Sequence, residues 1–423
     1  MSRSKASNAS GAIEIQEWSL AEHGIGPDTP AVNIFTALPH NSIAKAAAIT
    51  GIGRQRIVDV SRRSRAADEG QTDQKVQRCQ AQKEAACLEV DLERLEDALR
   101  KAQRAEQGAI VVIGMGEVNT GALCGQLRDI RILCDEYHAW LHVDAAFAAF
   151  ACLVPGFEWV SSDLDLADSI TSDAHKQLNV PYDCGLFYSR RKTAAGAVSA
   201  LIEHASQSPI DAVFGPGAGP KPAYLVGSST STSEAEDSRM LSEAEQRRQY
   251  AMSQPSPLFR NIENSRRFRA LPLYTALLSQ GRSGYVALVK RNVEFAKRLR
   301  RWLRLHQAFE VLTPAPDDKL TPQDASRASR VPWALDEWGY NIVLFRASQA
   351  CPNARLAGAE GAGRLVEAIK KTGKMYVSGT SWNGKGAVRI AVSSWLTGLD
   401  KDRKESDDDF NIVTSTLEEV IRQ

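Results

Sequence analysis

The feature that most constrains the fold is an alternation of helical and short apolar segments within residues 92–188. Apolar residues recur at helical spacing over 92–102, and a uniformly apolar run follows at 109–113. A second helical face at 127–137 precedes the apolar run 140–143. Short apolar runs between amphipathic helices are typical of parallel strands that are buried on both faces. The alternation therefore predicts an α/β fold built from right-handed βαβ units.

Two further strands are expected at 168–173 and 185–188. In open parallel sheets, ligands bind beyond the carboxyl ends of the strands. Asp144 directly follows the apolar run 140–143, so the sequence places an acidic side chain where a ligand is expected.

Residues 286–303 form a long amphipathic pattern, which predicts a helix that links two domains. We expect a large domain over residues 1–280 and a small α+β domain over 281–423. Two stretches interrupt the large domain, because 61–86 is charged and weakly periodic and 215–257 is rich in Gly, Pro, Ser and Glu. Both are predicted to be loops or insertions.

The small domain has its own pattern of elements. Residues 341–346 are predicted to form a strand and 361–371 a helix. Segments 375–382 and 387–395 flank Asn383-Gly384, a dipeptide that favours a two-residue hairpin turn. The sequence therefore predicts an antiparallel hairpin in this domain.

Composition excludes several classes of partner. The formal net charge is +1, so no strong field attracts nucleic acid or an anionic membrane. The seven cysteines form no CxxC pair, which argues against a zinc knuckle or a disulfide framework and favours a cytoplasmic protein. His138 ends a helical pattern while His142 lies in a predicted strand, so the two do not form a metal site on one helix. No apolar stretch is suited to target or span a membrane.

The most specific motifs are LHVDAAFAAF at 141–150 and ADSITSDAHKQLNVPYDCG at 167–185. They resemble the group II pyridoxal-phosphate-dependent decarboxylases, the family of aromatic-amino-acid and glutamate decarboxylases. Weaker matches follow the same order along the chain, at 37–54, 264–274 and 386–397. The resemblance implies the aspartate-aminotransferase-like fold (fold type I), pyridoxal 5'-phosphate as the cofactor and a homodimer.

The resemblance assigns the central cofactor contacts. Lys176 matches the lysine that bonds covalently to the cofactor aldehyde, and a lysine at a strand end is a suitable nucleophile. Asp144 matches the acid that accepts a hydrogen bond from the pyridine nitrogen and keeps it protonated. Ala146 matches the small residue beneath the cofactor ring. On the residues alone, a single lysine is more often a solvated charge and a single aspartate can be a turn residue.

Further contacts are implied around the ring and the phosphate. His40 matches the histidine that stacks on the ring, although without the resemblance it reads as a loop residue. His175 matches the histidine near the phosphate, and Asp173 occupies the neighbouring motif position. Asn119 and Thr120 lie where the family has a Gly-Thr-Thr sequence, and both are expected to contact the cofactor.

The start of the chain departs from the family pattern. Residues 5–8 resemble only the tail of the family's phosphate-binding loop, and Ser7 is the expected phosphate donor there. The sequence is therefore expected to be truncated at its N-terminus.

The resemblance implies α-decarboxylation of an L-amino acid to the amine and carbon dioxide. Within 220–257, where the family has a mobile catalytic loop bearing a tyrosine, Tyr224 and Tyr250 are both candidates. Related aldehyde synthases lack that tyrosine, so an aldehyde synthase or another carbon-carbon lyase is the alternative activity. An inactive homologue that acts as a binding protein is the alternative from another class. The substrate side chain is left open.

Overall fold

The computed structural model describes residues 25–26, 29–62, 89–189, 263, 265–312 and 340–423. Ser7, Tyr224, Tyr250 and nearly all of the two expected insertions lie outside these residues. The chain divides into two compact units, residues 1–29 with 190–268 and residues 30–189 with 269–423. The architecture below is that of the second unit.

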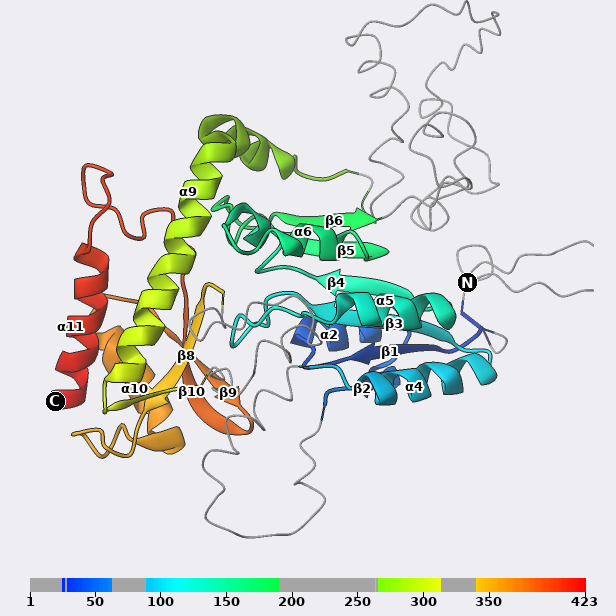
Figure 1. Ribbon diagram of the computed structural model, residues 1–423, viewed down its shortest axis with the longest axis horizontal. Helices are drawn as coiled ribbons and strands as arrows, with labels where there is room; N and C mark the ends of the chain where they lie inside the picture. Colours follow the sequence, from blue (N-terminus) through cyan, green and yellow to red (C-terminus); the bar gives the residue numbers. More distant parts are fainter. Residues whose placement is uncertain (1–24, 27–28, 63–88, 190–262, 264, 313–339) are drawn as a thin grey trace, which may run out of the picture. The chain divides into compact units, whose positions relative to one another are not determined.

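A six-stranded sheet forms the first half of this unit (Figure 1). Its strand order is β2-β1-β3-β4-β5-β6, in which the first five are parallel and β6 is antiparallel to β5. The bounds are β1 Val32–Thr36, β2 Ile57–Asp59, β3 Gly108–Gly114, β4 Trp140–Asp144, β5 Ser169–Asp173 and β6 Gly185–Ser189. The sequence prediction of a mainly parallel α/β sheet is confirmed.

Helices between the strands cover the sheet. The bounds are α2 Asn41–Ile49, α4 Leu92–Arg104, α5 Leu127–Glu136 and α6 Trp159–Leu164. Two single-turn 3-10 helices lie at Arg54–Arg56 and Ala151–Leu153. Helix α4 begins where the Asp91 carboxylate accepts a hydrogen bond from the Arg94 amide at 3.1 Å, which satisfies one of the free amides of the first turn.

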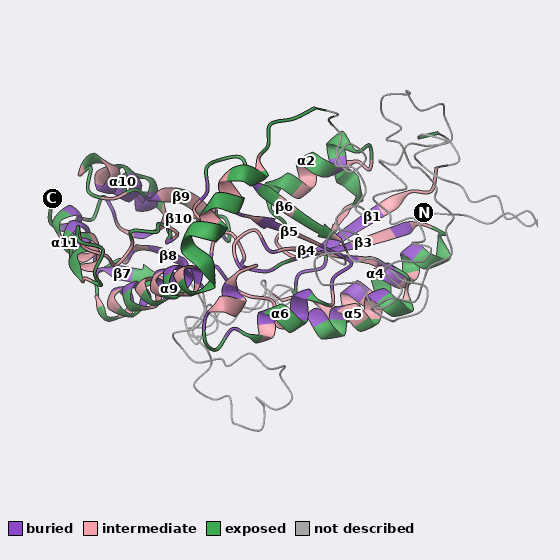
Figure 2. Cartoon of the chain, turned by 90° about the horizontal axis from the view of Figure 1, so that it is seen from above, coloured by how far each residue is buried: buried purple, intermediate pink, exposed green. Residues whose placement is uncertain are grey.

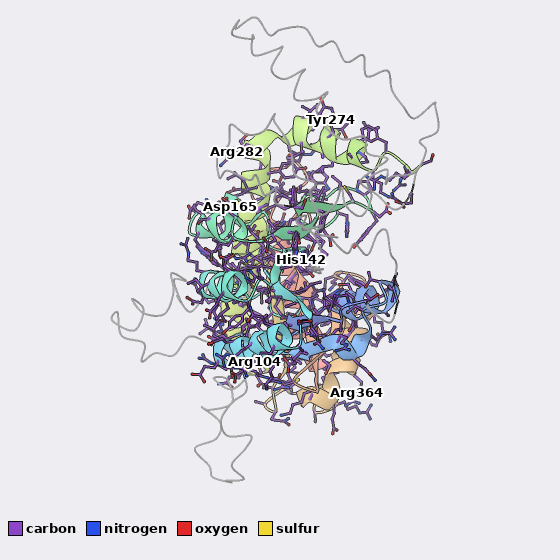
Figure 3. The ribbon with its side chains drawn as sticks, turned by 90° about the vertical axis from the view of Figure 1, so that its right-hand side faces the viewer. Arg104, His142, Asp165, Tyr274, Arg282 and Arg364 are labelled. Carbon is purple, nitrogen blue, oxygen red and sulfur yellow. The ribbon has the colours of Figure 1, made fainter. Side chains whose placement is uncertain are left out.

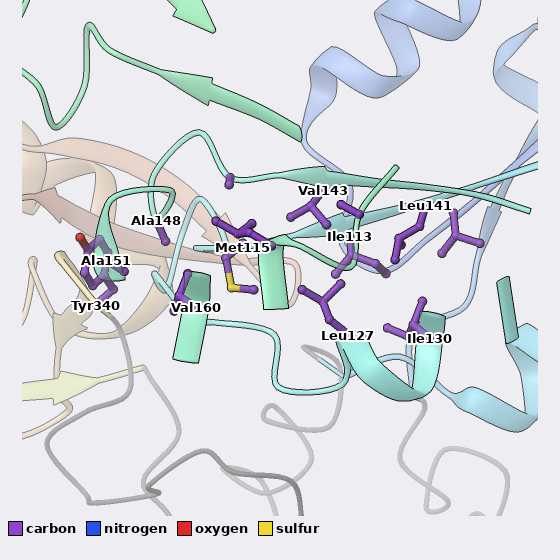
Figure 4. Close-up of a cluster of buried hydrophobic side chains, with 14 of the residues drawn as sticks. Ile113, Met115, Leu127, Ile130, Leu141, Val143, Ala148, Ala151, Val160 and Tyr340 are labelled. Carbon is purple, nitrogen blue, oxygen red and sulfur yellow. The ribbon is translucent and has the colours of Figure 1, made fainter. Parts of the chain in front are cut away.

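One face of the sheet is packed by apolar side chains (Figure 4). Leu141 and Val143 of β4 and Ile113 of β3 are at most 3% exposed, and they belong to one core with Leu127 and Ile130 of α5. Because side chains alternate along a strand, neighbouring residues such as His142 point to the opposite face. This alternation gives β4 one packed face and one polar face.

The second half of the unit is a four-stranded antiparallel sheet in the order β7-β8-β10-β9. Its elements are β7 Phe309–Val311, β8 Ile342–Ala347, α10 Gly358–Lys371, β9 Ser378–Trp382, β10 Lys385–Ala391 and α11 Asp408–Arg422. Asn383 and Gly384 join β9 to β10 at φ angles of 50° and 73°. Positive φ at both positions is what a type I′ hairpin turn requires, so the predicted hairpin is confirmed.

Helix α9, Ala270–Leu305, belongs to both cores. Its backbone is interrupted at Gly281, where φ is 59°. Beyond Gly281, the segment 285–293 packs in the core of the first sheet and the segment 296–303 in the core of the second. Figure 2 shows buried and exposed residues alternating along this helix. The predicted division of the chain near residue 280 stays a prediction.

Candidate functional site

A cavity of about 320 Å³ opens at the carboxyl ends of strands β1, β3, β4 and β5. Small-molecule pockets are typically roughly 300–1,000 Å³ in volume. Five of the side chains that the sequence analysis singled out line its wall. They are Asp144, Ala146, Asp173, Lys176 and His40. The parallel sheet therefore brings five of the expected site residues to one cavity.

Lys176 lies in the turn after β5, where its amide donates to the Asp173 carbonyl at 3.2 Å. Its Nζ atom lies 2.9 Å from Oδ2 of Asp173 and 4.0 Å from the centre of the Phe147 ring. A carboxylate and an aromatic face both attract an ammonium group, so the two hold the amine at the cavity wall.

Asp144 ends strand β4 and faces the cavity with part of its carboxylate available. Oδ1 accepts a hydrogen bond from the Ala146 amide at 3.2 Å, which fixes the carboxylate beside the cavity. Among the residues that the structure describes, no hydrogen-bond partner is found for Oδ2. One oxygen of a fixed carboxylate is thus open to a donor on a bound molecule.

Gly116, which also lines the cavity, has no room for a side chain. At Gly116, φ is 89° and a Cβ atom would lie 2.9 Å from the Cβ of Ala148. Both the left-handed backbone and the close approach therefore require glycine at this position.

His40 is the N-cap of helix α2 and also lines the cavity. Its Nδ1 atom lies 2.8 Å from Oγ of Ser42 and accepts from the Ser42 amide at 3.3 Å. The two contacts with Ser42 orient the His40 ring at the start of the helix.

His175 is engaged with the protein and does not reach the cavity wall. Its Nε2 atom lies 3.5 Å from Oδ2 of Asp173, and its Nδ1 atom lies 3.1 Å from the Cys184 carbonyl oxygen. Its ring packs against Tyr182 with centroids 4.4 Å apart. His175 therefore lies behind Asp173, and its contact with a phosphate stays a prediction.

The loop after β3 is organised by Glu117, a residue that the sequence motifs did not single out. Its carboxylate accepts from the amide and side chain of Asn119 at 3.0 Å and from the amide and hydroxyl of Thr120 at 2.7 Å. Glu117 lines the cavity, whereas neither Asn119 nor Thr120 does. Their predicted contact with a cofactor stays untested, and the visible role of both is to hold Glu117.

The C-terminal sheet fixes this loop from β9 and β10. Arg389 donates through Nε to the Val118 carbonyl, and its guanidinium carbon lies 5.2 Å from the centre of the Phe147 ring. Burial lowers the pKa of Arg389, while the nearby Glu117 carboxylate opposes that shift. The hydroxyl of Thr380 donates to Oδ1 of Asn119 at 2.7 Å. The sequence motif at 386–397 contained Arg389 but gave no reason to select it.

The turn that carries Lys176 has its own links to the segment after β10. Asn179 adopts a φ of 53°, donates to the Ser393 carbonyl and accepts from the Trp395 amide at 2.8 Å. Asparagine tolerates this left-handed conformation better than most residues. The loop after β3 is therefore held by the second sheet, and the turn that carries Lys176 is held by the segment that follows β10.

Within the described part of the chain, no cluster of three or more His, Cys, Asp or Glu side chains has the arrangement of a metal site. His138 follows α5 with a φ of 52°, while His142 lies within β4. Among the described helices, none combines the length and apolar character needed to cross a membrane.

Comparison with known proteins places this site in context. Residues 29–202 match the family model described as the pyridoxal-dependent decarboxylase conserved domain. A 4-hydroxyphenylacetaldehyde synthase from Rhodiola rosea is 23% identical over 330 residues, covering 77% of this chain and 52% of that protein. A tryptophan decarboxylase from Camptotheca acuminata is 23% identical over 305 residues, covering 71% of this chain and 48% of that protein. The chain spans about half the length of these curated relatives.

Solved structures share the same architecture. The crystal structure of Oryza sativa TDC with PLP and tryptamine matches with a TM-score of 0.61 and 20% identity, covering 92% of this chain and 62% of that chain. The crystal structure of the Rhodiola rosea 4-hydroxyphenylacetaldehyde synthase matches with a TM-score of 0.60 and 20% identity, covering 95% and 65%. At this identity the likeness shows a shared fold, and it confirms fold type I.

Proposed function

We propose that this chain, in which residues 29–202 match the pyridoxal-dependent decarboxylase conserved domain, binds pyridoxal 5'-phosphate through Lys176 and decarboxylates an L-amino acid to an amine and carbon dioxide. The observation that carries the proposal is the placement of the Lys176 amine and the Asp144 carboxylate on one cavity wall. The amine can bond to the aldehyde of the cofactor, and the carboxylate can accept a hydrogen bond from its protonated pyridine nitrogen.

The residues present fit this cofactor. Asp144 has one oxygen fixed by the Ala146 amide, and its other oxygen is available to accept a hydrogen bond from a protonated ring nitrogen. Ala146 contributes only a methyl group to the wall, which leaves room for a flat ring. Lys176 is partly exposed, at 25%, so its amine can be reached from the cavity.

The bound cofactor supplies an aldehyde for amines and an electron-withdrawing ring that accepts the electron pair released with carbon dioxide. Asp173 orients the Lys176 amine through the 2.9 Å contact with Nζ. Asp144 keeps a proton on the pyridine nitrogen by presenting a fixed negative charge. His40, on the start of α2, is in position to pack on the ring and fix its plane.

Aldehyde formation is the second candidate activity, because aldehyde synthases from Rhodiola rosea, Petunia hybrida and Aedes aegypti are among the relatives. Both activities release carbon dioxide. Product analysis separates them, since a decarboxylase yields the amine whereas an aldehyde synthase yields the aldehyde with hydrogen peroxide. Aromatic L-amino acids are the first substrates to test, given the tryptophan and tyrosine decarboxylases among the relatives.

The test of cofactor binding is an absorption spectrum after incubation with pyridoxal phosphate, followed by borohydride reduction and peptide mapping. We expect the label on Lys176 and its loss in Lys176→Arg. Lys45→Arg, at an exposed lysine of α2, is the matched control and should keep the label. Label on other lysines with none on Lys176 contradicts the assignment. A chain that binds no cofactor would instead be the inactive homologue.

We also propose a cytoplasmic homodimer. The dimer rests on the family resemblance, and the compartment rests on cysteines without CxxC pairing. Sedimentation analysis with and without cofactor tests the oligomeric state.

A further inference from the structure

Four polar side chains form a continuous hydrogen-bond chain across strands β4 and β5, on the sheet face that bears Asp144. The indole Nε1 of Trp140 donates to Oγ of Ser169 at 2.8 Å. The same Oγ lies 2.8 Å from Nδ1 of His142, and Nε2 of His142 lies 3.3 Å from Oγ1 of Thr171. The register pairs His142 with Ser169 and Asp144 with Thr171. The series of hydrogen bonds therefore ends at Thr171, the strand position beside Asp144.

The chain has a direction, because its first member can only donate. An indole N–H has no acceptor capacity, so Ser169 must accept from Trp140. The Ser169 hydroxyl is buried, and Nδ1 of His142 is the acceptor within reach of its proton among the described residues. A neutral imidazole that accepts at Nδ1 carries its proton at Nε2. Nε2 then donates to Oγ1 of Thr171.

The surroundings of His142 favour the neutral ring that this direction requires. Burial lowers the pKa of His142, and the Asp144 charge only partly opposes that shift. The ring also stacks on Phe187, with centroids 6.3 Å apart and planes 18° apart. Figure 3 shows His142 at the middle of the packed strands.

The last member of the chain lies at the cavity. Thr171 is one of the residues that line it. Its Oγ1 accepts from His142, so its own hydroxyl proton is not used within the chain. Among the described residues, no acceptor for that proton is found. A hydroxyl that accepts one hydrogen bond still has its own proton to donate, and the cavity is where a bound molecule would offer an acceptor.

We propose that Thr171 is a ligand-binding residue whose hydroxyl donates a hydrogen bond to an oxygen of the bound cofactor, and that Trp140, Ser169 and His142 are positioning residues that orient it. The inference rests on the proposed function, because the acceptor is an anionic oxygen of pyridoxal phosphate. His142 thus acts through Thr171 and does not itself touch the ligand.

A purely structural role for these residues makes a different prediction. Polar pairs across neighbouring strands stabilise a sheet modestly, whatever the direction of their protons. With a purely structural role, either tautomer of His142 would be tolerated. Substitution of these residues would then change the stability of the protein without changing its affinity for the ligand. The tautomer and the affinity are therefore the two measurements that decide.

The tautomer is measured on the cofactor-free protein by nitrogen NMR with labelled histidine. We expect His142 to carry its proton at Nε2. Replacement by Trp140→Phe or Ser169→Ala removes the directing donor, and we expect a mixture of tautomers in both variants. A proton at Nδ1 in the unsubstituted protein overturns the proposed direction, whether or not the cofactor binds.

Affinity is measured by equilibrium titration with pyridoxal phosphate. Loss of one hydrogen bond to a charged oxygen is expected to weaken binding by about tenfold to a hundredfold in Thr171→Val. Thr171→Ser keeps the hydroxyl and should restore binding to within about threefold. Thr171→Ala serves as a second variant if the protein with Thr171→Val does not fold. Thr416→Val removes a buried hydroxyl from α11 and is the matched control, with affinity unchanged.

The outcomes separate the two proposals. Binding to the unsubstituted protein that is equally tight in Thr171→Val and Thr171→Ala overturns the role of Thr171 and leaves the proposed function intact. Absence of binding to the unsubstituted protein overturns the proposed function and the role of Thr171 together. Weakened binding in both hydroxyl-free variants, with recovery in Thr171→Ser, supports the inference.

Discussion

The two faces of strand β4 differ in what holds them together. Leu141 and Val143 are fully buried against α5 and its neighbours, so this face is stabilised by the removal of apolar surface from water. His142 and Asp144, which alternate with them, are partly exposed and depend on directed hydrogen bonds. A five-residue strand therefore combines a rigid support with a row of chemical groups. The comparison predicts that substitutions on the first face alter folding, and those on the second alter binding and turnover.

The largest effect is expected from Leu141→Ala. It leaves a cavity in a fully packed core, and such changes typically cost about 2–5 kcal/mol of unfolding free energy. Urea denaturation followed by circular dichroism measures the loss. The folded fraction should bind pyridoxal phosphate as the unsubstituted protein does. A stable variant with weakened binding would show that the packed face also shapes the site.

Asp144→Asn should keep the cofactor and lose turnover. The cofactor remains held by Lys176, while its nitrogen loses the fixed charge that favours protonation. We expect turnover to fall by at least about tenfold, which corresponds to about 1.4 kcal/mol in the barrier. Carbon dioxide release from the fully loaded protein is the measurement. Turnover close to that of the unsubstituted protein would exclude the assigned role of Asp144.

His142 makes stability depend on pH in a defined direction. Because burial lowers its folded-state pKa below 6.5, the unfolded chain binds a proton more readily as pH falls. Its contribution to stability is complete above pH 6.5 and is lost as pH falls toward the folded-state pKa. Between about pH 7 and about pH 5.5, His142→Gln should therefore lose less stability than the unsubstituted protein.

Chemical denaturation at a series of pH values measures this difference in slope. His138→Asn, at an exposed histidine after α5, is the control and should keep the original slope. Identical slopes in all three proteins would mean that His142 does not titrate differently on folding.

The smallest effect is expected from Phe187→Leu on β6. Phe187 stacks on His142 but is 56% exposed, so its replacement should change the unfolding free energy by less than about 1 kcal/mol. The denaturation midpoint measures it. A larger loss would place Phe187 among the supporting residues, and the polar face would then be less dependent on hydrogen bonds than we infer.

Much of the fold could be predicted because its signals are local. Apolar spacing located α4, β3, α5 and β4 to within a few residues, and Asn383-Gly384 located the hairpin. The family resemblance assigned Lys176 and Asp144 to one cofactor, and both line the cavity at the carboxyl ends of the strands, where ligands of parallel sheets bind.

The missed residues depend on contacts that no local pattern contains. Thr171 reaches the cavity through its register beside Asp144, and Arg389 reaches the loop after β3 from a strand more than two hundred residues away. Glu117 was not singled out by any motif, and its role follows only from the four donors that surround its carboxylate. His142 was considered only as a metal ligand, because its partners lie on the next strand.

Helix α9 has a consequence for how the molecule unfolds. Its segments 285–293 and 296–303 are buried in different cores, yet they are consecutive turns of one helix. Unwinding either segment breaks backbone hydrogen bonds next to the other segment. The opening of one core therefore destabilises the folded state of the other core. The two sheets should therefore melt in one cooperative transition, and a partner or ligand that stabilises either sheet should protect the amide hydrogens of both from exchange with solvent.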